Sequence, residues 1–373
     1  MNPILKWPGG KSGEIDKIKH LIPEYDRYIE PFFGGGALYF YLQPQKAAIN
    51  DVSTSLIEFY TLIKEQSRDL HDLLMCYNDS FVKIISLCDS NYIEINRVYN
   101  DLKQQTIGNS QLTSEVEKLS NHLTAGLCES FKQKLVLSIE EFEKDIKRMV
   151  KDKMLRTVRN EEKREYSAAD LKENLVTGFT SGYYMYFRKV FNDLNLKRIA
   201  APSLPYKAAN FYFIREYCYG SMFRYNAKGE FNIPYGGMSY NKKKFINKIE
   251  SMFNEDVEKM FVNTEIHCSD FESFIKNIKL KNTDFMFLDP PYDTEFSDYE
   301  GVEFSKKDQE RLASSLRKTA AQFILVIKNT DFIYNLYKDG FNILTFDNQY
   351  TYNVRSRNER KVEHLIITNI PTK

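Results

Sequence analysis

The tetrapeptide Asp289-Pro290-Pro291-Tyr292 combines side chains suited to holding an amine. It follows the apolar run 285–288, which predicts a strand, and open α/β sheets bind ligands at the carboxyl ends of their strands. Because prolines have no amide hydrogen, the Asp289 carboxylate and the Pro290 carbonyl can serve as two adjacent acceptors for an exocyclic amine. Tyr292 supplies a flat face on which a base taken out of a duplex could stack. The alternative is a proline turn after a strand.

A glycine-rich loop, residues 30–36 (EPFFGGG), indicates a second ligand-binding feature. Glycine allows the backbone to approach a ligand closely and to adopt positive φ. Asp51 ends the next predicted strand, where a carboxylate can accept hydrogen bonds from ribose hydroxyls. The last glycine of a dinucleotide fingerprint is missing after Gly36, so we expect a nucleoside ligand without a pyrophosphate. A tight turn without a ligand is the alternative for the glycines.

The elements around these motifs alternate between strand and helix. Short apolar or β-branched runs predict strands at 28–29, 47–49, 285–288, 323–327 and 364–368, and residues 306–318 have a helical pattern. Such alternation favours an α/β sheet.

The stretch between about 63 and 216 has a different character, because it is charged, poor in glycine and rich in helical spacing. Apolar residues step by three and four over 116–127 and again over 135–149. We interpret residues 64–216 as a helical insertion, for which a packed helical hairpin is the simplest structure.

Bulk properties exclude several classes of protein. The 373 residues contain 52 Lys and Arg against 51 Asp and Glu, so any basic surface must be local. The five cysteines are scattered without metal-ligand spacing, and we expect neither disulfides nor a bound metal. Without a signal pattern or a long apolar run, the chain is expected to be cytoplasmic, with no membrane association.

Together, the motifs resemble those of the Dam-type DNA adenine N6-methyltransferases. The matching segments follow in family order: 5–11 (LKWPGGK), 30–38 (EPFFGGGAL), 50–57 (NDVSTSLI), 223–237 (FRYNAKGEFNIPYGG), 269–271 (SDF), 289–292 (DPPY) and 357–367 (RNERKVEHLII). The helical insertion is longer than expected of the small members of this family, which leaves the target sequence open.

The resemblance implies a Rossmann-like methyltransferase sheet, formed by 1–63 and 217–373, with a helical target-recognition domain inserted at 64–216. It implies S-adenosylmethionine as methyl donor and no metal. The residues that it assigns to the donor are Trp7, Lys11, Glu30, Phe32, Gly34, Gly36, Asp51, Asp270, Phe271 and Asp289. Lys11 suits the donor's carboxylate, and Asp270 suits its adenine amine. A buried core aromatic is the alternative for Trp7, and an exposed lysine is the alternative for Lys11.

Double-stranded DNA is the implied substrate, and a cognate restriction endonuclease is a candidate partner of a monomeric enzyme. The loop within 217–245 mixes aromatic residues with polar ones that could grip phosphates, namely Arg224, Asn226, Lys228 and Asn232. Residues 144–164 carry nine Lys or Arg against four Asp or Glu, which suits either a phosphate-facing stripe or a solvated helix face.

The expected reaction is direct displacement, with Asp289, Pro290 and Tyr292 as catalytic residues and adenine flipped out of the duplex. No cysteine lies within the motifs to form a covalent intermediate. Cytosine N4 or a protein glutamine are alternative acceptors for such a tetrapeptide. A regulator that binds nucleic acid and retains a vestigial donor pocket is the alternative of a different class.

Overall fold

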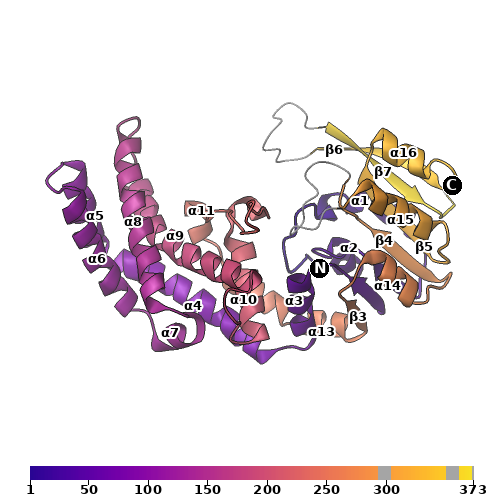
Figure 1. The fold of residues 1–373 in the computed structure, drawn as a ribbon, viewed down its shortest axis with the longest axis horizontal. Coiled ribbons are helices and arrows are strands. Elements are labelled where there is room, and N and C mark those ends of the chain that lie inside the picture. The colour runs from indigo at the N-terminus through magenta and orange to yellow at the C-terminus, as the bar shows by residue number, and fades with distance from the viewer. Residues whose placement is uncertain (293–303, 350–360, 372–373) are drawn as a thin grey trace. The chain divides into compact units, whose positions relative to one another are not determined.

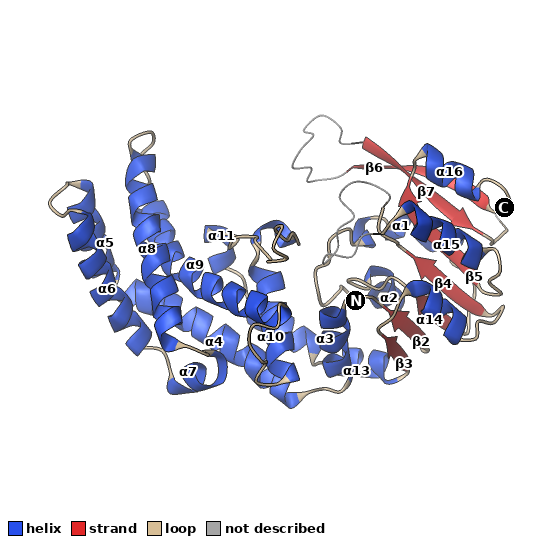
Figure 2. Ribbon diagram, viewed as in Figure 1, coloured by secondary structure: helices blue, strands red, loops and turns tan. Residues whose placement is uncertain are grey.

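The chain divides into two units of different architecture. The computed structural model describes residues 1–292, 304–349 and 361–371. One part, here called the sheet unit, consists of Met1–Gln66 and Asn254–Lys373, and the other, the helical unit, is Ser67–Phe253. All described strands belong to the sheet unit (Figure 2).

A seven-stranded sheet with the order β3-β2-β1-β4-β5-β7-β6 forms the centre of the sheet unit (Figure 1). The strands are β1 (Arg27–Glu30), β2 (Ala47–Asn50), β3 (Thr264–His267), β4 (Asp284–Leu288), β5 (Gln322–Lys328), β6 (Asn342–Gln349) and β7 (Lys361–Thr368). All neighbouring pairs are parallel except those made by β7, which is antiparallel to β5 and β6. The loops after β1, β2 and β4 therefore leave the same edge of the sheet.

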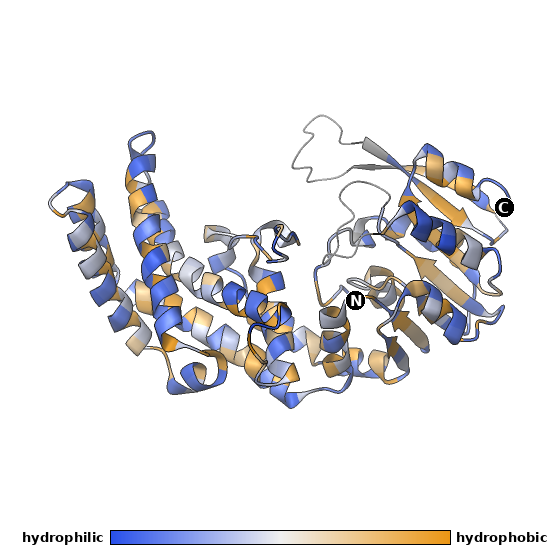
Figure 3. Ribbon diagram, in the orientation of Figure 1, coloured by the Kyte–Doolittle hydropathy of each residue, from blue (hydrophilic) through white to orange (hydrophobic). Residues whose placement is uncertain are grey.

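Helices of the sheet unit cover both faces of this sheet. They are α1 (Ile15–Ile18), α2 (Ala37–Leu42), α3 (Thr54–Lys64), α13 (Glu255–Val262), α14 (Phe271–Asn277), α15 (Lys306–Leu316) and α16 (Asp331–Tyr337), with 3-10 turns at Lys11–Gly13 and Lys19–Leu21. Apolar residues of α14, α15 and α16 pack in one core with strand residues such as Ile29 and Met286. These strands are among the apolar segments in Figure 3.

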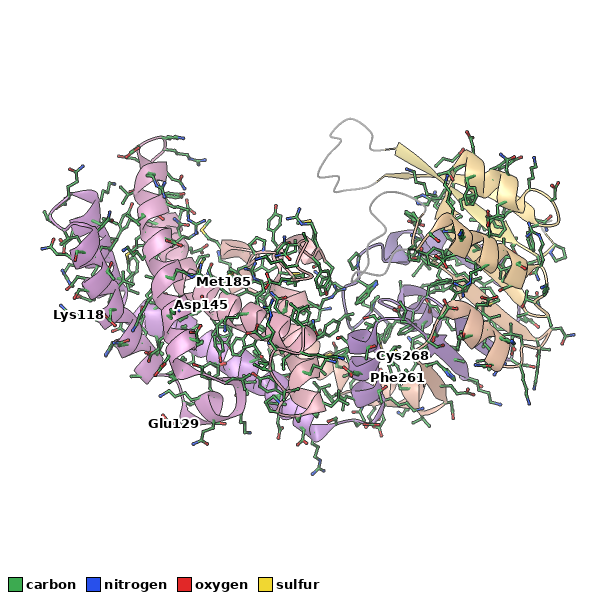
Figure 4. The ribbon with its side chains drawn as sticks, viewed as in Figure 1. Lys118, Glu129, Asp145, Met185, Phe261 and Cys268 are labelled. Carbon is green, nitrogen blue, oxygen red and sulfur yellow. The ribbon has the colours of Figure 1, made fainter. Side chains whose placement is uncertain are left out.

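The opposite face is closed by aromatic side chains. Successive strand residues point to opposite faces, so Tyr28 lies on the other side of the sheet from Ile29. Its ring is 6.2 Å from that of Tyr39 on α2 and 6.0 Å from that of Phe285 on β4. Phe261 of α13, labelled in Figure 4, extends the cluster at 5.5 Å from Tyr39. The glycine loop is thus followed directly by α2, which packs in this aromatic cluster through Tyr39.

The five predicted strands correspond to β1, β2, β4, β5 and β7, and the predicted helix at 306–318 corresponds to α15. The seven-stranded, mostly parallel sheet confirms the expected α/β class. Sequence patterns did not predict β3 and β6. β3 reads TEIH, and only its first residue is buried, so it has little apolar signal. The part of the 357–367 motif before residue 361 lies outside the described residues.

The helical unit contains the predicted helices and more. Its helices are α4 (Arg68–Ser90), α5 (Tyr92–Lys103), α6 (Asn109–Ala125), α7 (Glu129–Leu135), α8 (Ile139–Glu161), α9 (Ala168–Asn195), α10 (Leu204–Tyr217), α11 (Met238–Asn241) and α12 (Phe245–Met252), with a 3-10 turn at Tyr219–Ser221. The apolar steps at 116–127 and 135–149 lie mainly on α6 and α8, as expected. The exposed Lys118 and Glu129 point away from the bundle (Figure 4).

Close contact between α8 and α9 depends on a small residue. A Cβ added at Gly182 of α9 would lie 2.6 Å from the Cα of Ile146 and 3.0 Å from the carbonyl oxygen of Asp145. Only glycine fits at this crossing, so α8 and α9 pack as a helical hairpin with backbones nearly touching.

The boundary between the units differs from the one expected at 217. Residues 217–253 pack with the helical unit, and residues 64–66 stay with the sheet unit. The hydroxyl of Tyr184 on α9 donates to the carbonyl of Ile233 (3.0 Å), and the side-chain amide of Asn192 donates to the carbonyl of Phe231 (3.0 Å). The sequence did not show which unit the 223–237 motif packs with, because the motif is recognised by its own residues. Its packing partners on α9 lie elsewhere in the chain.

Within the described part of the chain, no helix has the length and apolar character needed to cross a bilayer.

Candidate active site

A cavity of about 450 Å³ in the sheet unit collects the predicted site residues. All those assigned to the donor or to catalysis line it: Trp7, Lys11, Glu30, Phe32, Gly34, Gly36, Asp51, Asp270, Phe271, Asp289, Pro290 and Tyr292. They come from the N-terminal segment and from the loops after β1, β2, β3 and β4. These loops meet because the strands are parallel neighbours.

The glycine loop is shaped by contact with Trp7. Gly34 has φ +49°, and a Cβ there would lie 2.7 Å from the Cδ1 atom of Trp7. Gly36 has φ +64°, and a Cβ there would lie 2.5 Å from the ring of Phe33. Both positions require glycine for conformation and for space. Trp7 is half-buried and lines the cavity, so it is not a core aromatic, which was its alternative.

Asp51 ties the end of β2 to the glycine loop. Its Oδ2 accepts from the backbone N–H of Gly34 (2.9 Å), and its Oδ1 accepts from the backbone N–H of Ser53 (2.9 Å). The preceding Asn50 is fully buried, and its side-chain amide donates to the carbonyls of Pro31 and Ser269. Asn50 therefore links the loops after β1, β2 and β3, and Asp51 is held in a fixed orientation.

Lys11 is buried, with 3% of the residue exposed, which rules out the exposed lysine considered from the sequence. Its ammonium lies 3.0 Å from Oδ1 of Asp289 and donates to the hydroxyl of Tyr292 at 2.6 Å. Further contacts are the carbonyl of Gly9 (3.3 Å) and the carboxylate of Glu14 (3.9 Å). The ammonium is therefore directed at the tetrapeptide.

Two acidic residues of the cavity have raised pKa values. Burial raises the pKa of the Asp289 carboxyl, and the neighbouring Lys11 opposes this shift. Burial raises the pKa of Glu30 well above its usual range, although the Tyr28 hydroxyl donates to its carboxylate at 2.8 Å and lowers it. The negative charges of Asp289 and Asp51 raise it further. The raised pKa favours the neutral form of Glu30. The lining still has four other carboxyl groups, those of Asp51, Asp270, Asp289 and Asp308, against the ammonium of Lys11, which suits a cationic ligand.

The tetrapeptide is held from two sides. The side-chain amide of Gln309 on α15 donates to the carbonyl of Pro291 at 2.9 Å, which leaves the Pro290 carbonyl as the acceptor expected beside Asp289. The Tyr292 hydroxyl lies between Lys11 and Nε2 of His364, which is 3.1 Å away. The Tyr292 phenol thus has bonding partners in addition to the stacking face expected from the sequence.

An aromatic group forms another wall of the cavity. The ring of Phe32 is 5.3 Å from that of Phe271 and 5.6 Å from that of Phe304. Oδ1 of Asp270 accepts from Arg311 (2.6 Å) and from the backbone N–H of Glu272 (3.1 Å). This wall offers flat apolar faces beside one fixed carboxylate, an arrangement suited to a purine with an exocyclic amine.

The 223–237 motif forms a hairpin in the helical unit. A bridge pairs Tyr225 with Phe231, and Oδ1 of Asn226 accepts from the backbone N–H groups of Lys228 (2.9 Å) and Glu230 (3.0 Å). Asn226 therefore closes the turn. Arg224 and Lys228 are exposed and available to a partner.

The basic stretch 144–164 follows α8, and its first half is neutralised locally. Lys147 pairs with Glu117 (3.0 Å), and Arg148 pairs with Asp145 (2.7 Å). Arg156 and Arg159, in the second half, are exposed, and each donates to a backbone carbonyl of its own helix. The candidate phosphate-facing region is thus the end of α8.

Sequence reasoning missed the residues that support the site. His364 carried one available signal, since it is a polar residue in a run predicted to be a buried strand, and Asn50 directly follows another such run. Gln309 and Arg311 are spaced as ordinary solvent-facing helix residues and could be found only from the structure. Among the described residues, no group of His, Cys, Asp or Glu is arranged to hold a metal ion.

Comparisons with known proteins point to one family. The family model of D12 class N6 adenine-specific DNA methyltransferases matches residues 7–154 and 144–352. The Type II methyltransferase M1.LlaDCHI of Lactococcus lactis subsp. cremoris is 25% identical, covering 99% of this chain and 95% of the relative. The Type II methyltransferase M.CviBI of Paramecium bursaria Chlorella virus NC1A is 24% identical, covering 99% of this chain and 100% of the relative. A DNA adenine methylase of Vibrio cholerae serotype O1 is 21% identical over 88% of this chain and 81% of its own length.

Proposed function

Because the chain belongs to the family of D12 class N6 adenine-specific DNA methyltransferases, we propose that its cavity transfers a methyl group from S-adenosylmethionine to N6 of an adenine flipped out of double-stranded DNA. The observation that carries the proposal is the position of Asp289. Its carboxylate is fixed by Lys11 in the same cavity as Trp7 and Asp51.

The residues of the cavity fit this donor. Asp51 suits ribose hydroxyls, and its charge suits a molecule with cationic groups. The Glu30 carboxyl, whose raised pKa favours the neutral form, offers hydrogen bonds. The rings of Phe32 and Phe271 can pack against the adenine ring of the donor. Asp270 would meet its amine through Oδ2, because Oδ1 is engaged by Arg311. When bound, S-adenosylmethionine supplies an electrophilic methyl group on a positively charged sulfur.

Asp289 and Pro290 orient the target amine. The carboxylate and the carbonyl accept its two N–H groups, which directs the nitrogen lone pair out of the plane of the base. Positioning of this kind contributes most of the rate in a direct displacement. As the nitrogen gains a methyl group it also gains positive charge, which the Asp289 carboxylate stabilises before a proton leaves. Lys11 lowers the pKa of that carboxyl and so opposes the effect of its burial.

The helical unit is the proposed target-recognition part, extended to Phe253 so that it includes the hairpin. Arg224 and Lys228 of the hairpin, and Arg156 and Arg159 of α8, are the proposed phosphate contacts. Asn226 is assigned to shaping the turn, and Asn232 to supporting Arg224, whose Nε lies 3.4 Å from its Oδ1. We further propose a monomer that needs no metal and, by analogy with relatives named Type II methyltransferases, pairs with a restriction endonuclease.

Methyl transfer with product analysis tests the proposal. The pure protein is incubated with donor labelled in the methyl group and with mixed-sequence duplex DNA, and the DNA is then digested to nucleosides. The expected product is N6-methyldeoxyadenosine. N4-methylcytosine, label in added protein, or no label at all would each contradict the proposal and would identify the alternative acceptor or a binding protein.

A further inference from the structure

His364 lies behind the catalytic tetrapeptide and reaches it from a different part of the chain. It belongs to β7, where it pairs with Lys328 of β5 and Phe346 of β6. The residue is fully buried, and its ring stacks on Phe346 at 5.5 Å with an angle of 22°. Its Nε2 lies 3.1 Å from the Tyr292 hydroxyl. A titratable ring is thus fixed in position at the end of the site that carries Asp289.

The Tyr292 hydroxyl determines how His364 bonds. An ammonium group has donors only, so the Tyr292 oxygen accepts from Lys11 at 2.6 Å. A hydroxyl has a single hydrogen, and Nε2 of His364, 3.1 Å away, can accept it. In that arrangement the ring is neutral, with its own hydrogen on Nδ1. A continuous chain of contacts runs from Asp289 through Lys11 and Tyr292 to His364.

We propose that His364 is a positioning residue for methyl transfer, because it orients the Tyr292 hydroxyl and thereby fixes the Lys11 ammonium against Asp289. This inference rests on the proposed function of the cavity. Lys11 has a flexible side chain with rotatable donors, so its position depends on the acceptors around it. Small displacements of aligned groups lower reaction rates strongly. The contribution of His364 is therefore geometric, and it touches neither donor nor base.

Protonation of His364 would reverse this arrangement. An imidazolium ring donates from both nitrogens, so the Tyr292 oxygen would face two cationic donors, Lys11 and His364. The other charged neighbours are Lys328 across the strand pair and Glu363 next in the chain, whose backbone carbonyl accepts from Asn329. Asp289 lies beyond Lys11. An imidazolium at this position would therefore oppose the arrangement that holds Lys11 against Asp289.

The test compares His364→Gln with His364→Leu in the full-length protein. The glutamine amide oxygen can accept from Tyr292 but does not titrate, whereas leucine fills space without an acceptor. His364→Leu should lower the single-turnover methylation rate by roughly tenfold, the equivalent of one hydrogen bond to a charged network. His364→Gln should recover most of the rate and should lose the part of the acid limb that belongs to the histidine. Ile366→Val, a buried change on the same strand, should leave the pH profile unaltered.

A double-mutant cycle separates positioning from packing. In a Tyr292→Phe background, His364→Leu should cause no further loss of rate, because the hydroxyl that links them is gone. The inference is overturned if His364→Leu retains the wild-type rate, if it is equally harmful without the Tyr292 hydroxyl, or if His364→Gln neither restores the rate nor changes the pH profile. Absence of methyl transfer by the wild type would instead reject the proposed function, so the two failures are distinguishable.

Discussion

The ammonium of Lys11, which is buried, and the carboxylate of Asp289, which is partly buried, form an ion pair with Nζ 3.0 Å from Oδ1, although 278 positions separate them in the chain. The pair joins the N-terminal motif to the tetrapeptide after β4. Because burial alone raises the pKa of Asp289 and Lys11 lowers it, the lysine determines how much of this carboxylate is ionised.

Replacing Lys11 by methionine should therefore shift the pH dependence of the reaction. Without the cation, the pKa of Asp289 rises further, so the ionised form that accepts from the amine is lost at a higher pH. The acid limb of the single-turnover rate should move to higher pH, and raising the pH should restore part of the rate. Lys6→Met, which removes an exposed lysine from the same segment, should leave the profile in place. An unshifted profile for Lys11→Met would show that Asp289 does not depend on this lysine.

The Tyr292 ring and hydroxyl should have separable functions. Stacking on an extruded base contributes about 1 to 3 kcal/mol in single-strand binders, so Tyr292→Ala should lose the fluorescence of 2-aminopurine at the target position. Tyr292→Phe keeps the ring and should retain that signal. It loses the bonds to Lys11 and His364, however, and its methylation rate should fall by about tenfold. A Tyr292→Phe variant with the wild-type rate would limit the role of this residue to stacking.

The sequence was sufficient to predict the cavity but not its support. Asp289, Asp51 and the glycine loop each follow an apolar strand, and parallel strands bring such loops together, so motif order implied a common site. The contacts of Lys11 with Asp289 and Tyr292 could not be predicted, because these partners are remote in sequence. His364 was unpredictable in this role, since β7 is inserted antiparallel between β5 and β6. The domain boundary at 217 also differed, because tertiary contacts hold the hairpin to α9.

Glu30 should lower the free energy of unfolding at neutral pH, compared with a side chain that does not titrate. Its pKa is raised in the folded state, so the folded protein keeps a proton that the unfolded chain releases. The stabilising effect of this proton is complete below the unfolded pKa, and stability is lost as the pH rises through the folded pKa. A pKa that differs by one between the folded and the unfolded protein corresponds to about 1.4 kcal/mol in the free energy of unfolding.

Glu30→Gln keeps an acceptor for the Tyr28 hydroxyl and removes the titration. The variant should unfold at higher urea concentration than the wild type at neutral pH, and the difference should narrow toward acid pH. The experiment is urea unfolding at a series of pH values. Parallel pH dependence of the two proteins would show that Glu30 is ionised in the folded state.

The hairpin in the helical unit should contribute to DNA affinity through its exposed cations. Lys228→Ala removes one proposed phosphate contact, so the slope of log affinity against log salt should decrease by about 0.9. Asn226→Ala should weaken binding more, because its side chain holds the turn through the backbone of Lys228 and Glu230. Lys318→Ala in the sheet unit, also exposed, is the matched control. Equal slopes for Lys228→Ala and the wild type would remove the hairpin lysine from the DNA contact.

The central claim is that the Asp289 carboxylate orients and stabilises the amine that is methylated. It is tested most directly by a single turnover with DNA and donor bound in advance, comparing the wild type with Asp289→Ala. The variant should bind DNA as the wild type does, yet form N6-methyladenine roughly a hundredfold more slowly, since the lost stabilisation belongs to the transition state. An Asp289→Ala protein that methylates adenine at nearly the wild-type rate would contradict the account and would move the chemistry away from this tetrapeptide.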